Sequence, residues 1–202
     1  IYHLLERVNV TACYATGMVT GQDKAIGGLV GYISGVTVIS CYATGSITGS
    51  SGVGGLVGYN NDIVKACYAT GAVTGTQYVG GLVGASLGGS TIGACYSVGA
   101  VTATTAAGGL VGQHGGGMVS GCFWDKDTAG LVVSDGGWGL PTNDMKRVGY
   151  YQNAGWSYSD WVIQDGQYPR LTWEETGGTP IPEPGPLPLA GQGTAAAPYR
   201  IT

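Results

Sequence analysis

Five cysteines are the residues whose type and spacing could most clearly support chemistry in this chain of 202 residues. They stand 28, 26, 28 and 27 residues apart, at Cys13, Cys41, Cys67, Cys95 and Cys122. Zinc sites use closely spaced ligand pairs such as Cys-x-x-Cys, and this pattern is absent from the sequence. His3 and His114 have no ligand spacing either. The sequence therefore predicts no metal centre and no cofactor.

The regular interval suggests instead that the cysteines lie above one another in consecutive repeats. At the spacing of stacked strands, about 4.8 Å, two Cα atoms are within range of a disulfide, but parallel side chains suit its torsion angle poorly. Cysteine is also among the most readily buried residue types. We expect an internal ladder of reduced thiols, with disulfides between adjacent repeats as the alternative.

Acidic residues after the last cysteine form a second, weak candidate site. Asp125 and Asp127 begin a stretch with oxygen-bearing side chains at alternate positions, as in a calcium loop. However, Ala129 occupies the third acidic position and Gly136 the twelfth, where a glutamate belongs. A carboxylate pair could also include Asp135, but nothing distinguishes these residues from solvated turn residues. Histidines and serines without geometry do not indicate a triad, and we expect no enzymatic activity.

Two phrases alternate along the first 122 residues. Gly-Gly-Leu-Val-Gly begins at Gly27, Gly54, Gly80 and Gly108, and Cys-Tyr-Ala-Thr-Gly or a variant of it begins at each cysteine. A period of about 27 residues with short β-branched runs and glycine turns favours a coil of β-strands. Within one repeat we expect three strands, over residues 67–70, 72–74 and 81–92. The predicted fold is all-β, a β-solenoid of about four to five rungs.

The two phrases resemble the GLUG repeat, which is found in large secreted and surface proteins of bacteria. The segment that follows, from Phe123-Trp124-Asp125 to Tyr168-Pro169-Arg170-Leu171-Thr172-Trp173, is similar to the segment that closes such arrays. The resemblance implies an extracellular or cell-surface bacterial setting and a structural or adhesive role, without chemistry. Some members carry a metallopeptidase domain elsewhere in a longer chain, but this sequence has no His-Glu-x-x-His motif.

The chain divides into five parts by composition. We expect an N-terminal cap helix at 1–8, the solenoid at 9–122, a Trp-rich α+β capping region at 123–175, a Pro/Gly-rich linker at 176–194 and a strand-like tail at 195–202. The capping region should cover the open strand edges at the end of the solenoid. Its expected helix spans Thr142–Asn153 with Thr142 as N-cap. We expect its core to contain Trp138, Trp156, Trp161 and Trp173, which could alternatively form a platform for sugars.

Charge and hydropathy exclude several classes of partner. The net charge of −4 offers no electrostatic footprint for nucleic acid. No apolar run is long enough to cross a membrane as a helix, so we expect no membrane insertion. The solenoid repeats carry only four charged residues, Asp23, Lys24, Asp62 and Lys65. So few charges suggest that assembly contacts or glycans cover the surface, and Asn9-Val10-Thr11 matches the sequon for N-glycosylation.

The two ends of the sequence resemble the halves of one cap. The tail contains Pro198, Tyr199, Arg200, Ile201 and Thr202, and the expected acceptor contains Ile1, Leu4, Leu5 and Val8 at helical spacing. We expect the tail to cross on a linker that spans at most roughly 50 Å and to add a strand to the N-terminal rung of the next protomer. Such a heterologous contact propagates a fibre. Alternatively, the 202 residues are one period of a longer tandem chain, or the tail is inert.

The sequence therefore predicts a non-enzymatic structural protomer of an extracellular bacterial filament or surface assembly, whose partner is itself. A carbohydrate- or host-binding adhesin module is the first alternative. Its platform would use Tyr14, Tyr42, Tyr68 and Tyr96, which follow the cysteines and should face outward if the cysteines face inward. An accessory domain of a larger surface peptidase is the second alternative.

Overall fold

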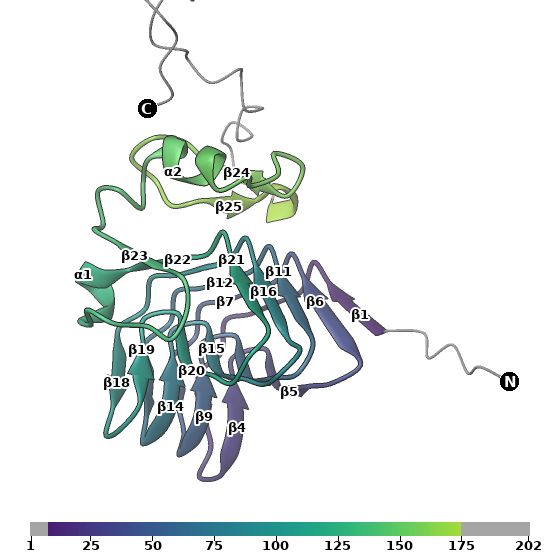
Figure 1. Cartoon of the computed structure of the whole chain (residues 1–202), viewed down its shortest axis with the longest axis vertical. Helices are drawn as coiled ribbons and strands as arrows, with labels where there is room; N and C mark the ends of the chain where they lie inside the picture. The colour runs from purple at the N-terminus through teal and green to yellow at the C-terminus, as the bar shows by residue number, and fades with distance from the viewer. Residues whose placement is uncertain (1–7, 175–202) are drawn as a thin grey trace, which may run out of the picture.

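A computed structural model describes residues 8–174 of the chain. Short strands wind into four complete coils and the beginning of a fifth (Figure 1). The equivalent strands of successive coils pair in parallel and in register, so that Val8 lies beside Val36 and Tyr68 beside Tyr96. The predicted all-β solenoid with a repeat of about 27 residues is therefore confirmed.

Each complete coil contains five strands. The first contains β1 (Val8–Thr11), β2 (Tyr14–Ala15), β3 (Val19–Thr20), β4 (Lys24–Gly27) and β5 (Val30–Ile33). The second contains β6 (Val36–Ile39), β7 (Tyr42–Ala43), β8 (Ile47–Thr48), β9 (Ser51–Gly54) and β10 (Val57–Asn60). The third contains β11 (Ile63–Lys65), β12 (Tyr68–Ala69), β13 (Val73–Gly75), β14 (Gln77–Gly80) and β15 (Val83–Ser86). The fourth contains β16 (Thr91–Gly93), β17 (Tyr96–Ser97), β18 (Val101–Ala103), β19 (Ala107–Gly108) and β20 (Val111–His114), and the fifth begins with β21 (Met118–Ser120) and β22 (Phe123–Asp125).

The expectation of three strands in each repeat is wrong. The range 81–92 holds β15 and β16, separated by a turn at Gly88 and Gly89, and β14 was not foreseen at all. Gly89 has a φ of 83°, a conformation that glycine adopts without strain. Each corner ends one strand and begins another, so a coil with more corners has more and shorter strands.

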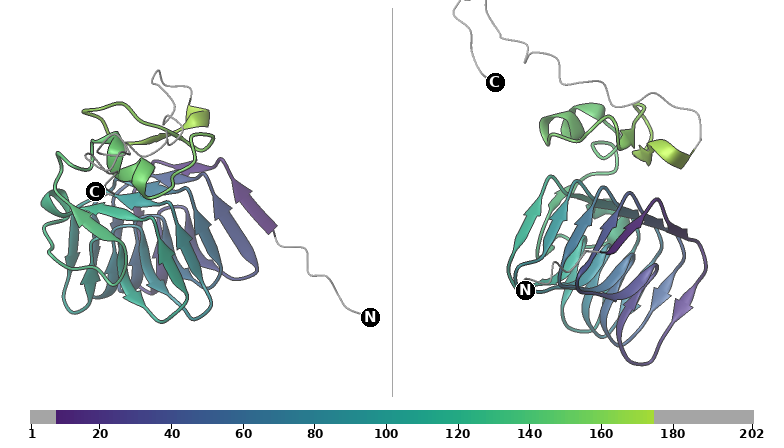
Figure 2. Two further views of the ribbon diagram at one scale, coloured as in Figure 1. Left: turned by 45° about the horizontal axis from the view of Figure 1, so that its top comes forward. Right: turned by 90° about the vertical axis from the view of Figure 1, so that its right-hand side faces the viewer.

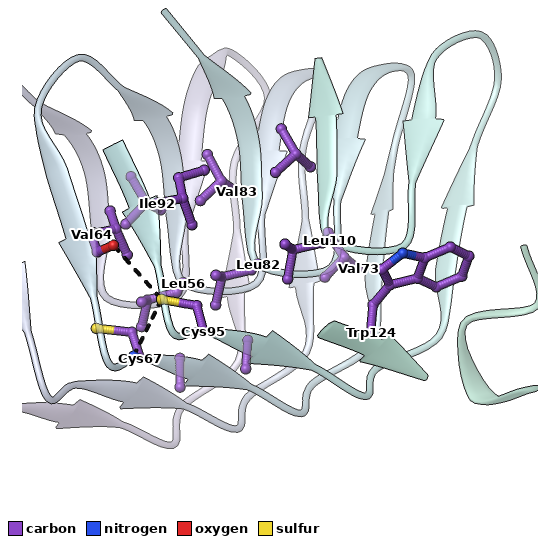
Figure 3. Close-up of a cluster of buried hydrophobic side chains, with 14 of the residues drawn as sticks. Leu56, Val64, Cys67, Val73, Leu82, Val83, Ile92, Cys95, Leu110 and Trp124 are labelled. Carbon is purple, nitrogen blue, oxygen red and sulfur yellow. Dashed lines mark hydrogen bonds between the residues drawn. The ribbon is translucent and has the colours of Figure 1, made fainter. Parts of the chain in front are cut away.

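The inside of the coils is filled by columns of identical or similar side chains. Leu56, Leu82 and Leu110 form one column and Val38, Val64 and Ile92 another, all with no exposed surface (Figure 3). The glycines of the Gly-Gly-Leu-Val-Gly phrase permit this stacking. A Cβ on Gly55 would lie 2.1 Å from the backbone oxygen of Gly81, so only glycine lets the coils approach each other this closely.

The closing segment, residues 126–174, follows the last coil and does two things. Its first part contains α1 (Lys126–Ala129) and β23 (Trp138–Leu140), and β23 pairs with β22 at the end of the solenoid. Its second part contains α2 (Val148–Asn153), β24 (Trp161–Val162), β25 (Arg170–Leu171) and a 3-10 turn (Thr172–Glu174). This second part turns back and lies along one side of the coils (Figure 2). The segment thus covers a flank as well as the end that the sequence predicted.

The expected helix at Thr142–Asn153 is shorter than predicted. It begins at Val148, with Arg147 at the N-cap position and no side-chain cap. Thr142 instead donates its hydroxyl to the carboxylate of Asp125, at 2.7 Å from Oδ2. Because its side chain is committed to the preceding turn, Thr142 cannot cap the helix.

Some expectations concern the ends of the chain. Residues 1–7, which include Ile1, Leu4 and Leu5, and residues 175–202, with the linker and tail, lie outside the described residues. Val8, placed by the sequence at the end of a cap helix, is the first residue of β1. Within residues 8–174, no helix is long and apolar enough to cross a membrane.

Candidate functional site

Four tyrosines stack along the outside of the coils, one on each of β2, β7, β12 and β17. The ring centroids of Tyr14 and Tyr42 are 5.2 Å apart, those of Tyr42 and Tyr68 4.9 Å, and those of Tyr68 and Tyr96 5.0 Å. They face away from the core, because alternation places them opposite the inward cysteines. The closing segment covers most of this ladder, so that Tyr96 is only 2% exposed whereas Tyr14 is 58% exposed.

Tryptophans of the closing segment make this cover. Trp156 and Trp161 are buried and contact Tyr96, with ring centroids 6.2 and 5.7 Å from its own. Trp173 stacks on Tyr42 and donates its indole N–H to the backbone oxygen of Ser40, at 2.9 Å. The sequence predicts Trp138 in the core of the capping region, but this prediction is wrong, since the residue is 74% exposed.

Hydrogen bonds hold the tyrosines beneath this cover. Tyr68 donates its hydroxyl to Glu174 Oε2 at 3.0 Å, and Tyr96 donates to the backbone oxygen of Pro169. Burial is the main cause that raises the pKa of Tyr68 and Tyr96 well above the ordinary value, and the charge of Glu174 adds to the effect. The ladder is therefore a neutral packing surface over most of its length, with only its first ring open to solvent.

The C-terminal end of the solenoid is closed. A Cβ on Gly109 would lie 1.9 Å from a ring carbon of Trp124, which shows how closely that indole covers the fourth coil. Beyond it, Ser134 Oγ accepts hydrogen bonds from the backbone N–H groups of Leu110 and Val111, at 3.0 and 3.1 Å. Leu131 packs against the core from the same segment. The end of the core and the edge of β22 are therefore covered, whereas β18, β19 and β21 still pair with a strand on one side only.

The N-terminal end has no such cover among residues 8–174. Val19, Ile26 and Leu29 point into the core like their counterparts in later coils, yet they are only partly buried. The corresponding Val73, Val79 and Leu82 of the third coil have no exposed surface. Each sheet also ends here in an edge strand, because β1, β2, β3, β4 and β5 have a partner on one side only. We call this surface the open end.

Glycines give an independent measure of what is missing at the open end. A Cβ on Gly45, Gly71 or Gly99 would lie 1.8–1.9 Å from the backbone oxygen of the equivalent glycine in the preceding coil. A Cβ on Gly17, the first of the series, would meet no atom of residues 8–174 within 4 Å. The backbone at Gly17 is therefore shaped for a strand that the described residues do not supply.

Large apolar side chains are exposed mainly at the two ends of the coils, with Tyr158 on the flanking part of the closing segment as the exception. Among the described residues, this set contains Val8, Tyr14, Met18 and Tyr32 on the first coil, Met118 on the fifth, and Val132, Val133, Trp138 and Tyr158 on the closing segment. None lies between β6 and β20. Exposed apolar clusters commonly mark contact surfaces.

The cysteines form one inward column, as their regular spacing in the sequence predicts. All five are free thiols, and only Cys13, at the open end, is partly exposed. The sulfur of Cys95 accepts a hydrogen bond from the backbone N–H of Cys67 at 3.4 Å (Figure 3). Burial raises the pKa of Cys67, Cys95 and Cys122. This arrangement disfavours thiolate chemistry at the inner positions.

The candidate calcium residues hold the turn that leads into the closing segment. Asp125 is fully buried and accepts hydrogen bonds from two backbone N–H groups of α1 and from the hydroxyls of Thr142 and Tyr168. Asp127 Oδ2 accepts from the backbone N–H of Thr142 at 2.9 Å. Burial and the hydrogen bond to Asp125 raise the pKa of Tyr168. Protein donors thus take up these carboxylates, and no group of three or more metal-ligating side chains occurs within residues 8–174.

Two further features complete the site. Asn9, the predicted glycosylation residue, lies exposed on β1, where a glycan could be attached without disturbing the core. Sequence reasoning did not find α1 or the cleft beside Trp138 that is described below. The capping pattern of Asp125 with Asp127 and Thr128 in the sequence is the signal that could have indicated α1.

Comparisons with known proteins support the repeat assignment. The family model described as the GLUG motif matches residues 23–48 and 49–74, which correspond to β4 to β8 and β9 to β13. The chain therefore contains two matched GLUG motifs, and the structure shows the same coil continuing beyond the matched residues. No curated protein and no solved structure matches the chain.

Proposed function

We propose that this protein is a non-enzymatic structural protomer that polymerises head-to-tail, with the open end of one copy placed against the closed end of the next. The observation that carries this proposal is that the exposed large apolar residues described, apart from Tyr158, lie on the first coil or around the closed end. Apolar surface removed from water contributes about 25 cal/mol per Å², so both ends gain by contact. Because the two ends differ, the contact is heterologous and propagates a chain.

The unpaired edges of the open end favour a strand as part of the contact. Edge strands have free backbone N–H and C=O groups that another chain can pair with. Residues 195–202, with Pro198, Tyr199, Arg200, Ile201 and Thr202, are the donor segment that we propose, taken from the preceding copy in the fibre. The vacant position in front of Gly17 fits a strand at this place.

The setting that we propose is the bacterial cell surface or extracellular space. This part of the proposal rests on the family resemblance and on the low charge of the coils. Residues 8–122 contain four charged residues, of which Asp62 is buried. A surface with so few charges is poorly suited to a dispersed monomer. A glycan-binding platform on the tyrosine ladder is less favoured, because the closing segment covers Tyr68 and Tyr96.

A methyl group at Gly17 tests the proposal. The Gly17→Ala variant should fold normally, because a Cβ there meets no atom within 4 Å. It should fail to form fibres, because the methyl group would occupy the place of the incoming strand's carbonyl oxygen. We would compare wild type and variant by negative-stain electron microscopy and light scattering, and check the fold by thermal unfolding.

Gly149→Ala is the matched control, because Gly149 lies on α2 and also has open space around it. This variant should form fibres like the wild type. Fibres of unchanged length and morphology from Gly17→Ala would show that the open end does not receive a strand.

A further inference from the structure

A cleft of about 470 Å³ lies at the junction of the last coil and the closing segment. Its walls come from the turn between β21 and β22, from β23 and from α2 (Figure 1). The side chains that matter for its chemistry are Phe123, Trp138, Tyr150, Ser120 and Asn153. A second cleft of about 380 Å³ shares Tyr150 and Asn153 and extends the first past α2. The second cleft is also lined by Arg147 and Asp165, so only the first is free of charged residues.

The chemistry of the first cleft suits an uncharged, extended chain. No charged residue lines it, and its rim carries the most exposed aromatic ring described, Trp138. Phe123 meets Trp138 edge-on, with ring centroids 6.4 Å apart. Flat aromatic rings bind proline rings in the recognition of polyproline segments, while side-chain donors bind the backbone carbonyls. Ser120 and Asn153, which line the cleft, can supply such donors.

We infer that this cleft holds the proline-rich segment of the same chain, residues 180–188. Pro180, Pro182, Pro184, Pro186 and Pro188 occur at every second position, and Glu183 is the only charged residue between them. Such a segment favours the extended polyproline conformation, so it loses little conformational entropy on binding. Ile181 and Leu187 add apolar side chains to the segment.

The place where the described chain ends agrees with this inference. Glu174 is bonded to Tyr68 of the third coil, and the neighbouring Trp173 lies against Tyr42 of the second. The cleft lies at the fifth coil, two to three coil spacings away, which is roughly 10–15 Å along the axis. Residues 175–179 can span about 16 Å when extended. Residues 175–179 are therefore long enough to cover the axial distance from Glu174 to the cleft.

Binding in the cleft would direct the tail. Residues 189–202 would emerge at the closed end, next to the place where the open end of the following copy arrives. The chain would thus carry its strand back along its own length and present it across the junction. This consequence rests on the proposed function, whereas the intramolecular binding itself does not.

The indole N–H signal of Trp138 provides a direct test in the full-length protein. It is assigned in a ¹H–¹⁵N NMR spectrum as the signal lost in Trp138→Phe. We would replace the five prolines of residues 180–188 by serine, which preserves the length and the tail. This variant should shift the Trp138 signal relative to wild type and leave the Trp161 signal unchanged, since Trp161 is buried. The shift should not depend on protein concentration.

Adding a synthetic peptide of residues 178–190 to the five-serine variant should restore the wild-type signal with saturable binding. Combining the five serines with Trp138→Ala should weaken peptide binding, measured by calorimetry, at least about tenfold. Combining them with Tyr158→Ala, which changes an exposed ring outside the cleft, should leave binding unchanged. Identical Trp138 signals in wild type and five-serine variant, with no response to the peptide, would overturn the inference. A response to cellobiose or maltose but not to the peptide would overturn it as well, in favour of a sugar site.

Fibre formation distinguishes this inference from the proposed function. If the Trp138 signal responds as expected but no variant or wild type forms fibres, the intramolecular site stands and the assembly proposal fails. If fibres form normally from the five-serine variant and the Trp138 signal is insensitive to it, the assembly stands without this site.

Discussion

The open and closed ends of the solenoid are built from nearly the same repeat, yet their side chains lie in different environments. Leu29 and Leu110 belong to the same Gly-Gly-Leu-Val-Gly phrase, but only Leu110 is fully buried. The difference comes from what lies beyond each coil: Trp124 and residues 131–140 at one end, and no described residue at the other. In a stacked repeat, the energetic value of a residue depends on its neighbours in the adjacent coils.

The largest expected difference in stability is between two tryptophans of the closing segment, the buried Trp161 and the exposed Trp138. Trp161→Ala removes a fully buried ring in contact with Tyr68, Tyr96 and Trp156, and should lower the free energy of unfolding by about 3–5 kcal/mol. Trp138→Ala, made in the five-serine variant so that no docked segment contributes, should change it by less than about 0.5 kcal/mol. Urea unfolding followed by far-UV circular dichroism measures both. Equal losses would contradict the burial difference on which the comparison depends.

Two leucines at the same position of the Gly-Gly-Leu-Val-Gly phrase, Leu82 and Leu29, allow a comparison between the middle of the core and the open end. Leu82→Ala creates a cavity in the middle of the core and should cost about 2–5 kcal/mol. Leu29→Ala, at the open end, should cost about 1 kcal/mol, because part of this side chain is already in contact with water. The measurement is again urea unfolding, on dispersed protein. A Leu29→Ala loss as large as that of Leu82→Ala would mean that some part of the chain already covers the open end.

Alkaline pH should weaken the covered part of the tyrosine ladder. Burial raises the pKa of Tyr96 and Tyr151 in the folded protein, whereas both ionise near pH 10 when unfolded. Their contribution is therefore complete below about pH 10 and is lost as the pH rises above it, by about 0.8 kcal/mol per tyrosine at pH 10.5. Unfolding of wild type and Tyr96→Phe from pH 8 to 10.5 measures the effect. A wild-type stability that stays flat over this range would refute it.

The smallest expected effect is a change in the labelling of one thiol, Cys13, which reports on the open end alone. Cys13 should react with a maleimide in dispersed protein, while the four buried cysteines should react only on unfolding. In fibres, the preceding copy should protect Cys13 by covering the open end. Mass spectrometry of labelled peptides measures this. Labelling of Cys13 at equal rates in dispersed and fibrous protein would place the contact elsewhere.

The sequence revealed the coil but not how its end is closed. Equal spacing of the cysteines and of the Gly-Gly-Leu-Val-Gly phrases is enough to predict stacking in register, because each column must repeat with the coil. The number of strands in a coil depends on backbone conformation at corners such as Gly88-Gly89, which periodicity does not encode. Buried Trp161 and exposed Trp138 differ only through long-range packing, so composition alone could not separate them. The hydrogen bond that occupies the Thr142 side chain likewise joins it to Asp125, 17 residues away, which no local pattern indicates.

The closing segment also sets how many coils the protein can have. It is fixed to the fifth coil through β23 and reaches the second coil, where the indole of Trp173 binds the backbone of Ser40. The segment therefore spans a set number of coils, because its two anchor points lie on the fifth coil and the second. Duplication of one internal repeat would preserve every contact between coils, yet it would separate the two anchor points by one more spacing and leave a tyrosine uncovered. Repeat number and closing segment must consequently change together when such proteins lengthen or shorten in evolution.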